Sequence, residues 1–446
     1  MFLKRLVLAL VALIVFGMSW QLGEVLGFSV AGLGVLALAG LLAFVFALAY
    51  LLFGQHKTGR SPVPMDASVL LFGVFVAVNF ASIGWADRPN IAISSSIAYF
   101  QLLVFVWLLA FLRSEKYAFS ILLHAYLFGI SVIAIVTFMD IGLHGLAEVD
   151  RRLDGFNMTA NRFAYKLLLG IPVSIYLFQR STATSFRWLY LYYVPLGLVL
   201  VILTGSRTGL VALGAVLAAL TWFVVTVEKG KGSRLSATRT LTAVAVVAGV
   251  LVLLLPFLAA ETPRHIERFA TLVDPAASGI GGRSEMWAAA IAVYLENFLL
   301  GIGSGGGGTA ILPYFEGDVY VFTFLDRGVS LHSVYLTVAT GTGTVGLLLF
   351  LAVIISLVFR ALSFPREERL LFLSMIGASV VMALTLGLEQ SRDFFFALFL
   401  PVALSLAHYP AGARTKARSR TRSRSKRSPG SRSVPVHRPP HSAARS

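Results

Sequence analysis

Two arginines and a histidine in this sequence stand at positions where their side chains could act on a charged substrate. Arg207 lies in the turn TGSRTGL between two apolar runs, and no acid in the turn can pair with it. Arg283 lies in GGRSEMW and His332 in LHSVYL, each next to an apolar helical pattern. A guanidinium group at membrane depth needs a partner or a water-filled cavity, and its planar fork suits phosphate or carboxylate oxygens. A neutral imidazole can accept a proton from a sugar hydroxyl.

Each of these residues also has a simpler interpretation. An isolated arginine can extend to lipid headgroups or pair with an acid such as Glu285 or Asp326. His332 can be an ordinary histidine at the start of a helix. Two glycine-flanked arginines on one predicted face weaken the simpler interpretation of the arginines, whereas for His332 taken alone the simpler interpretation is favoured.

Three further polar residues, Glu389, Gln390 and Arg392, lie in GLEQSRDFFF at the same predicted membrane depth. They form either a helix cap with an ion pair or part of a polar cavity. The glycine-rich GIGSGGGG at 301–308 lacks the Lys-Ser/Thr of a phosphate-binding P-loop, and predicts a hinge or a close approach of backbone to a ligand. Few acids are closely spaced on this face, so we expect no metal site and no cofactor.

The elements that must position these residues are membrane helices. The chain of 446 residues is 57% hydrophobic and 13% charged, with a mean hydropathy of +0.82, and it contains no cysteine. Apolar runs near the ~20 residues that span a bilayer predict an all-α polytopic membrane protein. The twelve predicted spans are 5–22, 28–53, 67–85, 95–112, 118–139, 162–179, 188–203, 208–227, 240–259, 331–359, 369–388 and 392–408.

Lys and Arg fall in alternate loops, which predicts that both termini are cytoplasmic. The opposite face then carries two longer segments, 140–161 and 260–330, the second with a short interfacial helix. We therefore divide the chain into a membrane domain, 1–410, and a tail, 411–446. The tail carries 11 Lys and Arg and no acid, and it predicts a disordered segment beside anionic lipid. It has no aromatic residue for base stacking, so we expect no specific nucleic acid partner.

The ordered motifs SRTG (206–209), GGRSEMW (281–287), GIGSG (301–305) and LHSVYL (331–336) resemble those of the O-antigen ligase and O-antigen polymerase superfamily. NRFAY (161–165) is similar to a motif that the family places before its sixth span. The family commonly has Asn where this chain has Ser333, and the basic tail has no counterpart in its pattern.

The resemblance implies a fold of the GT-C glycosyltransferase kind and an active site on the periplasmic face of the bacterial inner membrane. It implies that a glycan passes from undecaprenyl diphosphate to an acceptor hydroxyl, which in the ligases belongs to lipid A-core. Arg207 and Arg283 would then bind the donor diphosphate, and His332 would activate the acceptor, without a metal ion. Asn161 and Arg162 of NRFAY, with Glu389, Gln390 and Arg392, would contact substrate.

Three other functions stay open. An O-antigen polymerase would use the same donor with a lipid-linked acceptor, and a protein O-glycosyltransferase is a more distant relative. A transporter or flippase for an anionic lipid would also need intramembrane arginines, but transporters typically show broken helices and midplane charges. The compact outer loop favours the ligase.

Overall fold

The computed structural model describes residues 2–19, 29–30, 33–53, 66–115, 117–144, 158–181, 188–228, 283–315 and 329–405. Contacts group the chain into one unit up to Ser405, and a second unit follows. The predicted span 240–259 and the basic tail lie outside the described residues, as does most of the segment 260–330 that precedes Arg283. The domain division and the count of twelve spans therefore stay predictions.

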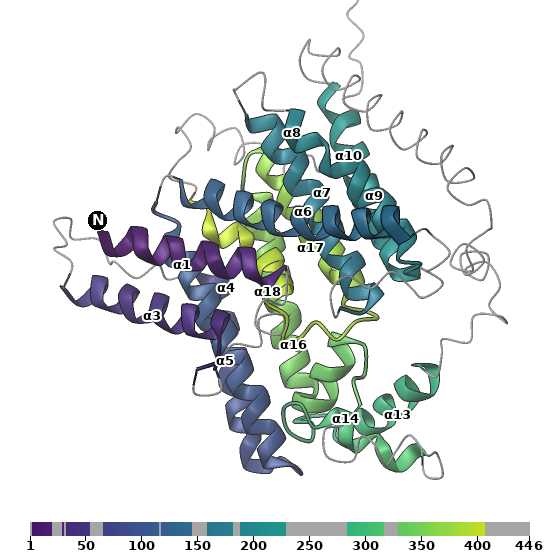
Figure 1. The fold of residues 1–446 in the computed structure, drawn as a ribbon. Coiled ribbons are helices and arrows are strands. Elements are labelled where there is room, and N and C mark those ends of the chain that lie inside the picture. The colour runs from purple at the N-terminus through teal and green to yellow at the C-terminus, as the bar shows by residue number, and fades with distance from the viewer. Residues whose placement is uncertain are drawn as a thin grey trace, which may run out of the picture. The chain divides into compact units, whose positions relative to one another are not determined.

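The described part of the chain is helical apart from one short antiparallel pair, β1 (Ser29–Val30) with β2 (Leu33–Gly34). The α-helices are α1 (Phe2–Met18), α3 (Val35–Phe53), α4 (Ala67–Ala81), α5 (Pro89–Leu112), α6 (Ala118–His144), α7 (Ala160–Arg180), α8 (Trp188–Leu191), α9 (Tyr193–Leu203), α10 (Arg207–Glu228), α13 (Arg283–Glu296), α14 (Gly307–Ala310), α16 (Val334–Leu362), α17 (Arg366–Met382) and α18 (Arg392–Phe399). Three 3₁₀ helices are η1 (Ser82–Trp85), η3 (Leu312–Phe315) and η4 (Leu400–Ala403). Figure 1 shows this arrangement.

Five of the described helical segments are long and apolar enough to cross a bilayer. They are Val35–Phe53, Ala67–Trp85, Pro89–Leu112, Ala118–Leu143 and Val334–Leu362. Many of their large apolar side chains are exposed, for example Leu41 and Phe100, which only a lipid environment favours in such number. The protein is therefore an all-α membrane protein.

One predicted span, 331–359, does not form a straight helix. Gly343 within α16 has φ 64° and ψ −162°, outside the helical region. The rings of Tyr335 and Phe350 are 6.3 Å apart, whereas a straight helix would separate residues fifteen positions apart by about 22 Å. The chain therefore reverses at Gly343, and α16 is a helical hairpin with a short first arm, Val334–Thr342. The predicted span 331–359 overlaps the apolar segment Val334–Leu362, but the sequence did not reveal the reversal within it, because a glycine with positive φ inside an apolar run leaves no trace in the hydropathy pattern.

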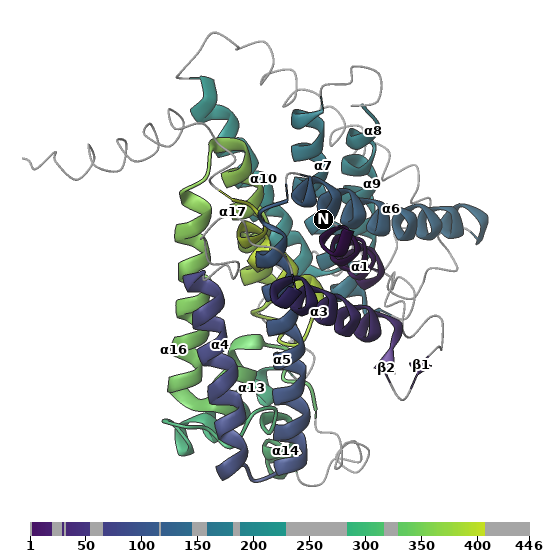
Figure 2. The same cartoon turned by 90° about the vertical axis from the view of Figure 1, so that its left-hand side faces the viewer.

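The glycine-rich segment 301–308 packs against this reversal and is not a hinge. Ile302 N donates to Thr340 O at 3.0 Å, and Gly303 N donates to Gly341 O at 2.9 Å. A Cβ on Gly301 would lie 2.6 Å from the backbone of Gly341, so glycine is needed for the contact. The close approach that the sequence predicted is made to another part of the chain. In Figure 2, α4, α5 and α16 run side by side, with α13 and α14 at one end of them.

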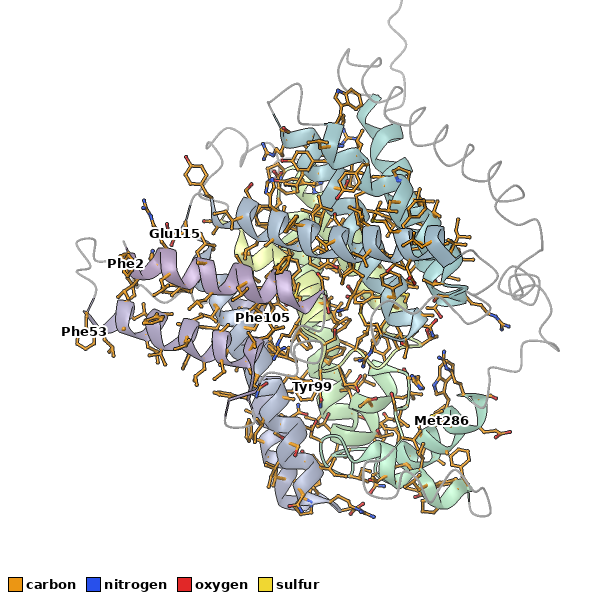
Figure 3. All side chains as sticks on the ribbon, viewed as in Figure 1. Phe2, Phe53, Tyr99, Phe105, Glu115 and Met286 are labelled. Carbon is orange, nitrogen blue, oxygen red and sulfur yellow. The ribbon has the colours of Figure 1, made fainter. Side chains whose placement is uncertain are left out.

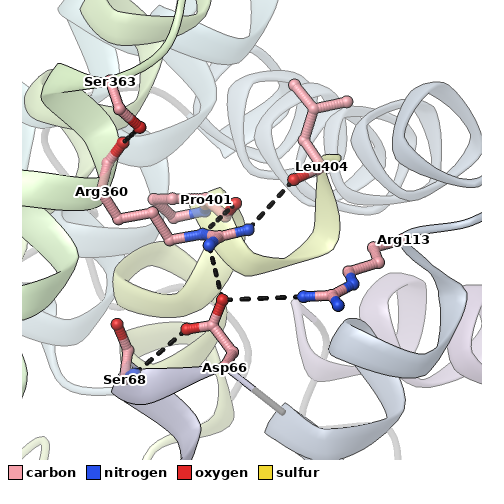
Figure 4. A network of polar contacts seen from close by, with 7 residues as sticks. All are labelled: Asp66, Ser68, Arg113, Arg360, Ser363, Pro401 and Leu404. Carbon is pink, nitrogen blue, oxygen red and sulfur yellow. Dashed lines mark hydrogen bonds and ion pairs between the residues drawn. The ribbon is translucent and has the colours of Figure 1, made fainter. Parts of the chain in front are cut away.

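A buried carboxylate ties three of these helices together at the other end. Asp66 caps the first turn of α4 by accepting a hydrogen bond from Ser68 N. Its second oxygen accepts from Arg360, near the end of α16, and lies 3.7 Å from Arg113, which follows α5 (Figure 4). Arg360 also donates to the carbonyl oxygens of Pro401 and Leu404. Arg113 and Arg360 are thus gathered at one end, as the charge pattern predicted, while the cytoplasmic orientation of that end stays a prediction.

Candidate active site

The arginines singled out in the sequence share one local position, the first turn of a helix. Arg207, Arg283 and Arg392 are the first residues of α10, α13 and α18, and Arg162 is the third residue of α7. A helix N-terminus carries a partial positive charge, so cations are disfavoured there and anions are favoured. No acid occupies the first turn of α7 or α10. The starts of α7 and α10 are therefore electropositive, whereas the first turns of α13 and α18 contain Glu285 and Asp393.

His332 lies in the short segment that leads into α16, and its backbone is held from three sides. Its φ of 48° is in the left-handed region, which makes it the one non-glycine residue with positive φ among those described. His332 N donates to Ser330 Oγ at 3.3 Å, and Trp287 Nε1 donates to Leu331 O at 3.0 Å. Val334 N donates to Ala383 O at 2.9 Å. A strained conformation of this kind costs about 1–3 kcal/mol and persists only where the surroundings enforce it.

Ser333 explains a departure from the family pattern. Its side chain is buried and accepts a hydrogen bond from Leu336 N, so it is the N-cap of α16. Asn and Ser are about equally good N-caps. The serine at this position is therefore accounted for by helix capping.

Two arginines act on the imidazole of His332. Burial is the largest cause that lowers the pKa of His332, and the positive charges of Arg283 and Arg162 lower it further. The imidazole is therefore mainly neutral at pH 7 and can accept a proton. Residues from α7, α13 and the start of α16, far apart in the sequence, thus lie together in one electrostatic cluster.

The segment 383–391, between α17 and α18, connects this cluster to the other helix starts. Arg162 donates to Gly387 O at 3.1 Å, and Thr385 Oγ1 donates to Thr208 Oγ1 at 2.7 Å. A Cβ on Gly387 would lie 3.0 Å from Ser330 Oγ, beside the backbone of His332. The 383–391 segment therefore contacts the first turns of α7 and α10 and the residue two positions before His332.

The first turn of α10, where Arg207 lies, packs against the early part of α7. A Cβ on Gly209 would lie 3.1 Å from the Cβ of Ala164, so the first turns of α10 and α7 are in tight contact. No contact joins Arg207 to His332 directly. Within the described parts of the chain, the guanidinium groups of Arg207, Arg283 and Arg392 make no hydrogen bond or ion pair.

A polar pocket of about 490 Å³ opens beside Arg162 and the 383–391 segment. It is lined by Met18, Leu36, Ala37, Arg162, Tyr165, Lys166, Gly387, Leu388, Glu389, Gln390, Ser391, Arg392 and Asp393. Of the predicted residues, Arg162, Glu389, Gln390 and Arg392 line it, while Asn161 is buried in the first turn of α7. Gln390 Nε2 also donates to Ser95 Oγ at 3.2 Å, which anchors the pocket rim on α5.

Sequence reasoning missed two charged residues of this pocket, Lys166 and Asp393. Both are buried, and Lys166 Nζ lies 3.2 Å from Asp393 Oδ2. Lys166 Nζ also donates to the carbonyl oxygen of Met18 at 2.5 Å, at the C-terminal end of α1, where cations are favoured. The detectable signal was a lysine within the apolar run FAYKLLLG and an acid preceding FFFALFL, since intramembrane charges usually pair.

Glu389 is the remaining acid of the pocket. Burial raises its pKa, which the positive charge of Arg162 opposes, and its Oε2 has no hydrogen-bond partner. No group of three or more metal-ligating side chains occurs within the described ranges. The charged residues that line this pocket are three cations, Arg162, Lys166 and Arg392, and two acids, Glu389 and Asp393, and the excess of cations suits an anionic ligand.

Trp287 should act as a positioning residue for His332, because its indole N–H fixes the carbonyl of Leu331. We expect Trp287→Phe to lower kcat about tenfold or more with a smaller change in KM, since small misplacements of a catalytic group are costly. The free energy of unfolding should fall by about 1 kcal/mol, the value of one hydrogen bond. Steady-state kinetics with a fluorescent glycan donor measure both constants.

Trp85→Phe is the matched control, because Trp85 Nε1 makes a similar bond to Leu300 O, at 3.3 Å, away from His332. If both variants lose kcat equally, the positioning role of Trp287 is wrong.

The sequence was then compared with known proteins. Comparison with curated proteins found no match. The sequence model of a family described as O-antigen ligase matches residues 192–351, a segment that contains Arg207, Arg283 and His332. Arg162 and the 383–391 segment lie outside it. This match, on a described structure that is helical and membrane-spanning, shows that the segment 192–351 is similar to the O-antigen ligase family and supports the resemblance to the O-antigen ligase and O-antigen polymerase superfamily.

Proposed function

We propose that this protein is an O-antigen ligase, which transfers a glycan from undecaprenyl diphosphate to a sugar hydroxyl of lipid A-core. The family match over residues 192–351 supports the coarser statement, a glycosyltransferase-like membrane enzyme of O-antigen assembly with lipid-linked glycan substrates. The observation that carries the finer proposal is the gathering of arginines at helix starts, around a histidine whose pKa is lowered.

In this proposal the donor diphosphate supplies the anionic partner of Arg207 and Arg283. Arg283, whose charge acts on His332, and Arg207 have no ion-pair partner among the described residues, so neither needs to break one to bind phosphate. Preformed cations of this kind stabilise a leaving group as its charge develops. In this proposal the arginines neutralise the departing diphosphate, and no metal ion is needed.

His332 removes the proton from the acceptor. The hydroxyl oxygen attacks the anomeric carbon of the donor sugar, and the bond from that carbon to the phosphate oxygen breaks. The proton of the hydroxyl passes to the neutral imidazole, and undecaprenyl diphosphate leaves with the bonding electron pair. Arg283 and Arg162 keep the imidazole neutral before this step, which keeps the base available at neutral pH.

The proposed setting is the inner membrane, with both termini in the cytoplasm and the site facing the periplasm. The Lys- and Arg-rich loops support this orientation. An O-antigen polymerase is the alternative within the same superfamily, since it would use the same arginines and a different acceptor.

Two features of the structure favour a second class of function, an anionic-lipid transporter. The hairpin in α16 is a broken helix, and Lys166 with Asp393 is an ionisable pair inside the helical bundle. Both features are typical of transporters. The test must therefore separate transfer from transport.

The test is glycan transfer from undecaprenyl diphosphate to purified lipid A-core by the detergent-solubilised protein, with EDTA present. The ligase proposal expects product in EDTA. Elongation of lipid-linked glycan without transfer to lipid A-core would identify a polymerase. Absence of both reactions, with movement of lipid-linked glycan across proteoliposomes, would identify a transporter.

The pH dependence of glycan transfer should change when the positive charge of Arg283 is removed, because that charge lowers the pKa of His332. Because neutral His332 is the active form, kcat/KM should rise with pH through the pKa of His332, which lies below 6.5. Arg283→Gln removes a positive charge, so the pKa of His332 should rise and the acid limb should move to higher pH. Arg5→Gln, at an exposed position on α1, should leave the limb in place. A limb that stays fixed in Arg283→Gln would contradict the assignment.

The guanidinium fork of Arg207 should matter more than its charge. We expect Arg207→Lys to lower kcat/KM about tenfold through a higher donor KM, because lysine cannot make paired hydrogen bonds to phosphate. Arg88→Lys, the N-cap of α5 at an exposed position, is the matched control and should change neither constant. Unchanged kinetics in both variants would show that Arg207 does not bind the diphosphate in this way.

A further inference from the structure

The residues proposed to bind the diphosphate and to act as the base lie on two separate parts of the fold. Arg283 and His332 belong to one part, because Trp287 of α13 donates to the carbonyl oxygen of the residue before His332 and the two segments share a hydrophobic cluster. Met286 of α13, labelled in Figure 3, packs against this cluster. Arg207 begins α10 and makes no hydrogen bond to either residue within the described ranges. The position of Arg207 relative to His332 is therefore set by the contacts that link the two parts.

The turn that carries Arg207 is built as a rigid unit. Gly205 has a φ of 60°, in the left-handed region that glycine favours. Ser206 Oγ accepts a hydrogen bond from Gly209 N at 3.0 Å and so caps the first turn of α10. Thr204 Oγ1 accepts from Ser206 N at 3.2 Å, and both of these side chains are fully buried. The backbone of Arg207 therefore moves together with the start of α10.

A bond between two side chains ties this rigid turn to the 383–391 segment. Thr385 Oγ1 donates to the Oγ1 atom of Thr208, the second residue of α10, at 2.7 Å. Two residues earlier on the same segment, Ala383 O accepts from Val334 N at 2.9 Å. Val334 follows His332 by two residues. One short stretch of the segment thus bonds both to the helix start of the arginine and to the helix start of the histidine.

The segment is itself fixed, so it can hold the two helix starts in register. The side chains of Leu386 and Leu388 are buried in the bundle. Tyr335 Oη donates to Val380 O at 3.2 Å, which is a second bond between the first arm of α16 and the end of α17. Thr385 lies between these anchors, and its side chain is half-buried. Loss of its hydroxyl removes a link to α10 and leaves the bonds to α16 in place.

We propose that Thr385 is a positioning residue for glycan transfer, which through its bond to Thr208 fixes Arg207 relative to His332. This inference rests on the proposed function and extends it, because it names the pair of residues that sets the separation between the phosphate-binding group and the base. Transfer needs the attacking oxygen within about 3–3.5 Å of the anomeric carbon, and a misplacement of about 1 Å can lower a rate about 100-fold. Thr385 lies outside the segment that the family model matches.

The first test removes the hydroxyl of Thr385 and keeps the shape of its side chain. We expect Thr385→Val to lower kcat about tenfold and to change the donor KM less than about twofold, because Arg207 still binds the diphosphate but holds it out of line with the base. Thr385→Ser keeps a hydroxyl and should restore most of the wild-type kcat. Ser356→Ala is the matched control, because Ser356 Oγ donates to Val353 O at 2.7 Å within the second arm of α16. It should change neither constant.

Thr208→Val breaks the same bond from its other side and serves if Thr385→Val fails to fold. If a single bond carries the effect, the double variant of Thr208→Val with Thr385→Val should lower kcat no further than either single variant, because residues that act through one contact are not additive. Additive losses in the double variant would overturn the proposal. Unchanged kcat in both single variants, or failure of Thr385→Ser to restore kcat, would also overturn it.

Amide hydrogen exchange of the detergent-solubilised full chain gives a readout that needs no substrate. The amides of Gly209 and Leu210 donate to Ser206 and protect the first turn of α10. We expect them to exchange about fivefold faster in Thr385→Val, the effect of one lost hydrogen bond on local opening. They should exchange at the wild-type rate in Thr385→Ser and in Ser356→Ala. Unchanged exchange in Thr385→Val would overturn the proposal even if kcat falls.

Failure of this inference is distinguishable from failure of the proposed function. If the wild-type protein transfers no glycan, the proposed function fails, and hydrogen exchange still decides whether Thr385 holds the start of α10. If the wild-type protein transfers glycan to lipid A-core and Thr385→Val keeps its kcat, the proposed function stands and the positioning role of Thr385 is wrong.

Discussion

Replacing His332 by glycine is expected to lower glycan transfer by about 10²- to 10⁴-fold, the contribution of a general base, while the protein stays folded. Glycine is the informative substitution because the native φ of 48° suits it without strain. The relief of strain and the greater freedom of glycine in the unfolded chain oppose each other, so the free energy of unfolding should change by less than about 1 kcal/mol. Transfer assays and thermal unfolding on the same preparation measure the two effects.

His124→Gln controls for the loss of an imidazole elsewhere. His124 lies on α6, where its ring hydrogen-bonds Ser120 O and Tyr190 Oη, and it has no contact with the candidate site. This variant should transfer glycan at the wild-type rate. If His332→Gly keeps more than about a tenth of wild-type activity, the hydroxyl proton is removed by another group.

Replacing Lys166 by methionine is expected to destabilise the protein by about 3–5 kcal/mol, the effect of removing one partner from a buried ion pair. Lys166 and Asp393 are both nearly enclosed, and the loss leaves Asp393 charged without its counter-ion. The carbonyl oxygens of Met18 and Ser19 at the end of α1 also lose their donor. Chemical unfolding in mild detergent gives the change in free energy.

The double variant Lys166→Met with Asp393→Leu should recover most of this loss, because an apolar pair removes the uncompensated charge. Lys4→Met is the matched control for a surface pair. Lys4 lies 3.0 Å from Glu115, with both side chains partly exposed, so the expected change is about 0–1 kcal/mol. If Lys4→Met and Lys166→Met lower the free energy of unfolding by similar amounts, the buried pair contributes no more to stability than the surface pair.

Several features of this molecule follow from local sequence alone. Apolar runs near 20 residues fixed the class and most helix positions, because hydrocarbon requires every backbone polar group to be bonded within a helix. Arg283 and His332 were identified from residue type and context, and Arg162 from the resemblance of NRFAY to a family motif. In the fold, the charges of Arg283 and Arg162 both act on His332. The ends of helices coincide with these residues because polar side chains stop an apolar run at the membrane surface.

Other features depend on contacts between distant segments. The reversal at Gly343 is decided by the glycine-rich segment 301–308, which packs where a side chain would not fit. Hydropathy does not distinguish a hairpin of two apolar arms from one long helix. The pairing of Lys166 with Asp393 could not be predicted either. A lone charge in an apolar run indicates that the residue needs a partner, but it does not indicate which residue the partner is.

The amino-acid sequence by itself determined that this is a helical membrane protein with arginines and a histidine gathered at helix ends, because those properties rest on local composition and spacing. Only the tertiary structure decided that the 383–391 segment joins the helix starts of α7, α10 and α16, and that Arg392 lines a polar pocket together with Arg162. The physical reason is that a pocket is made by side chains from segments far apart in the chain, and their relative placement depends on packing that no short stretch of sequence encodes.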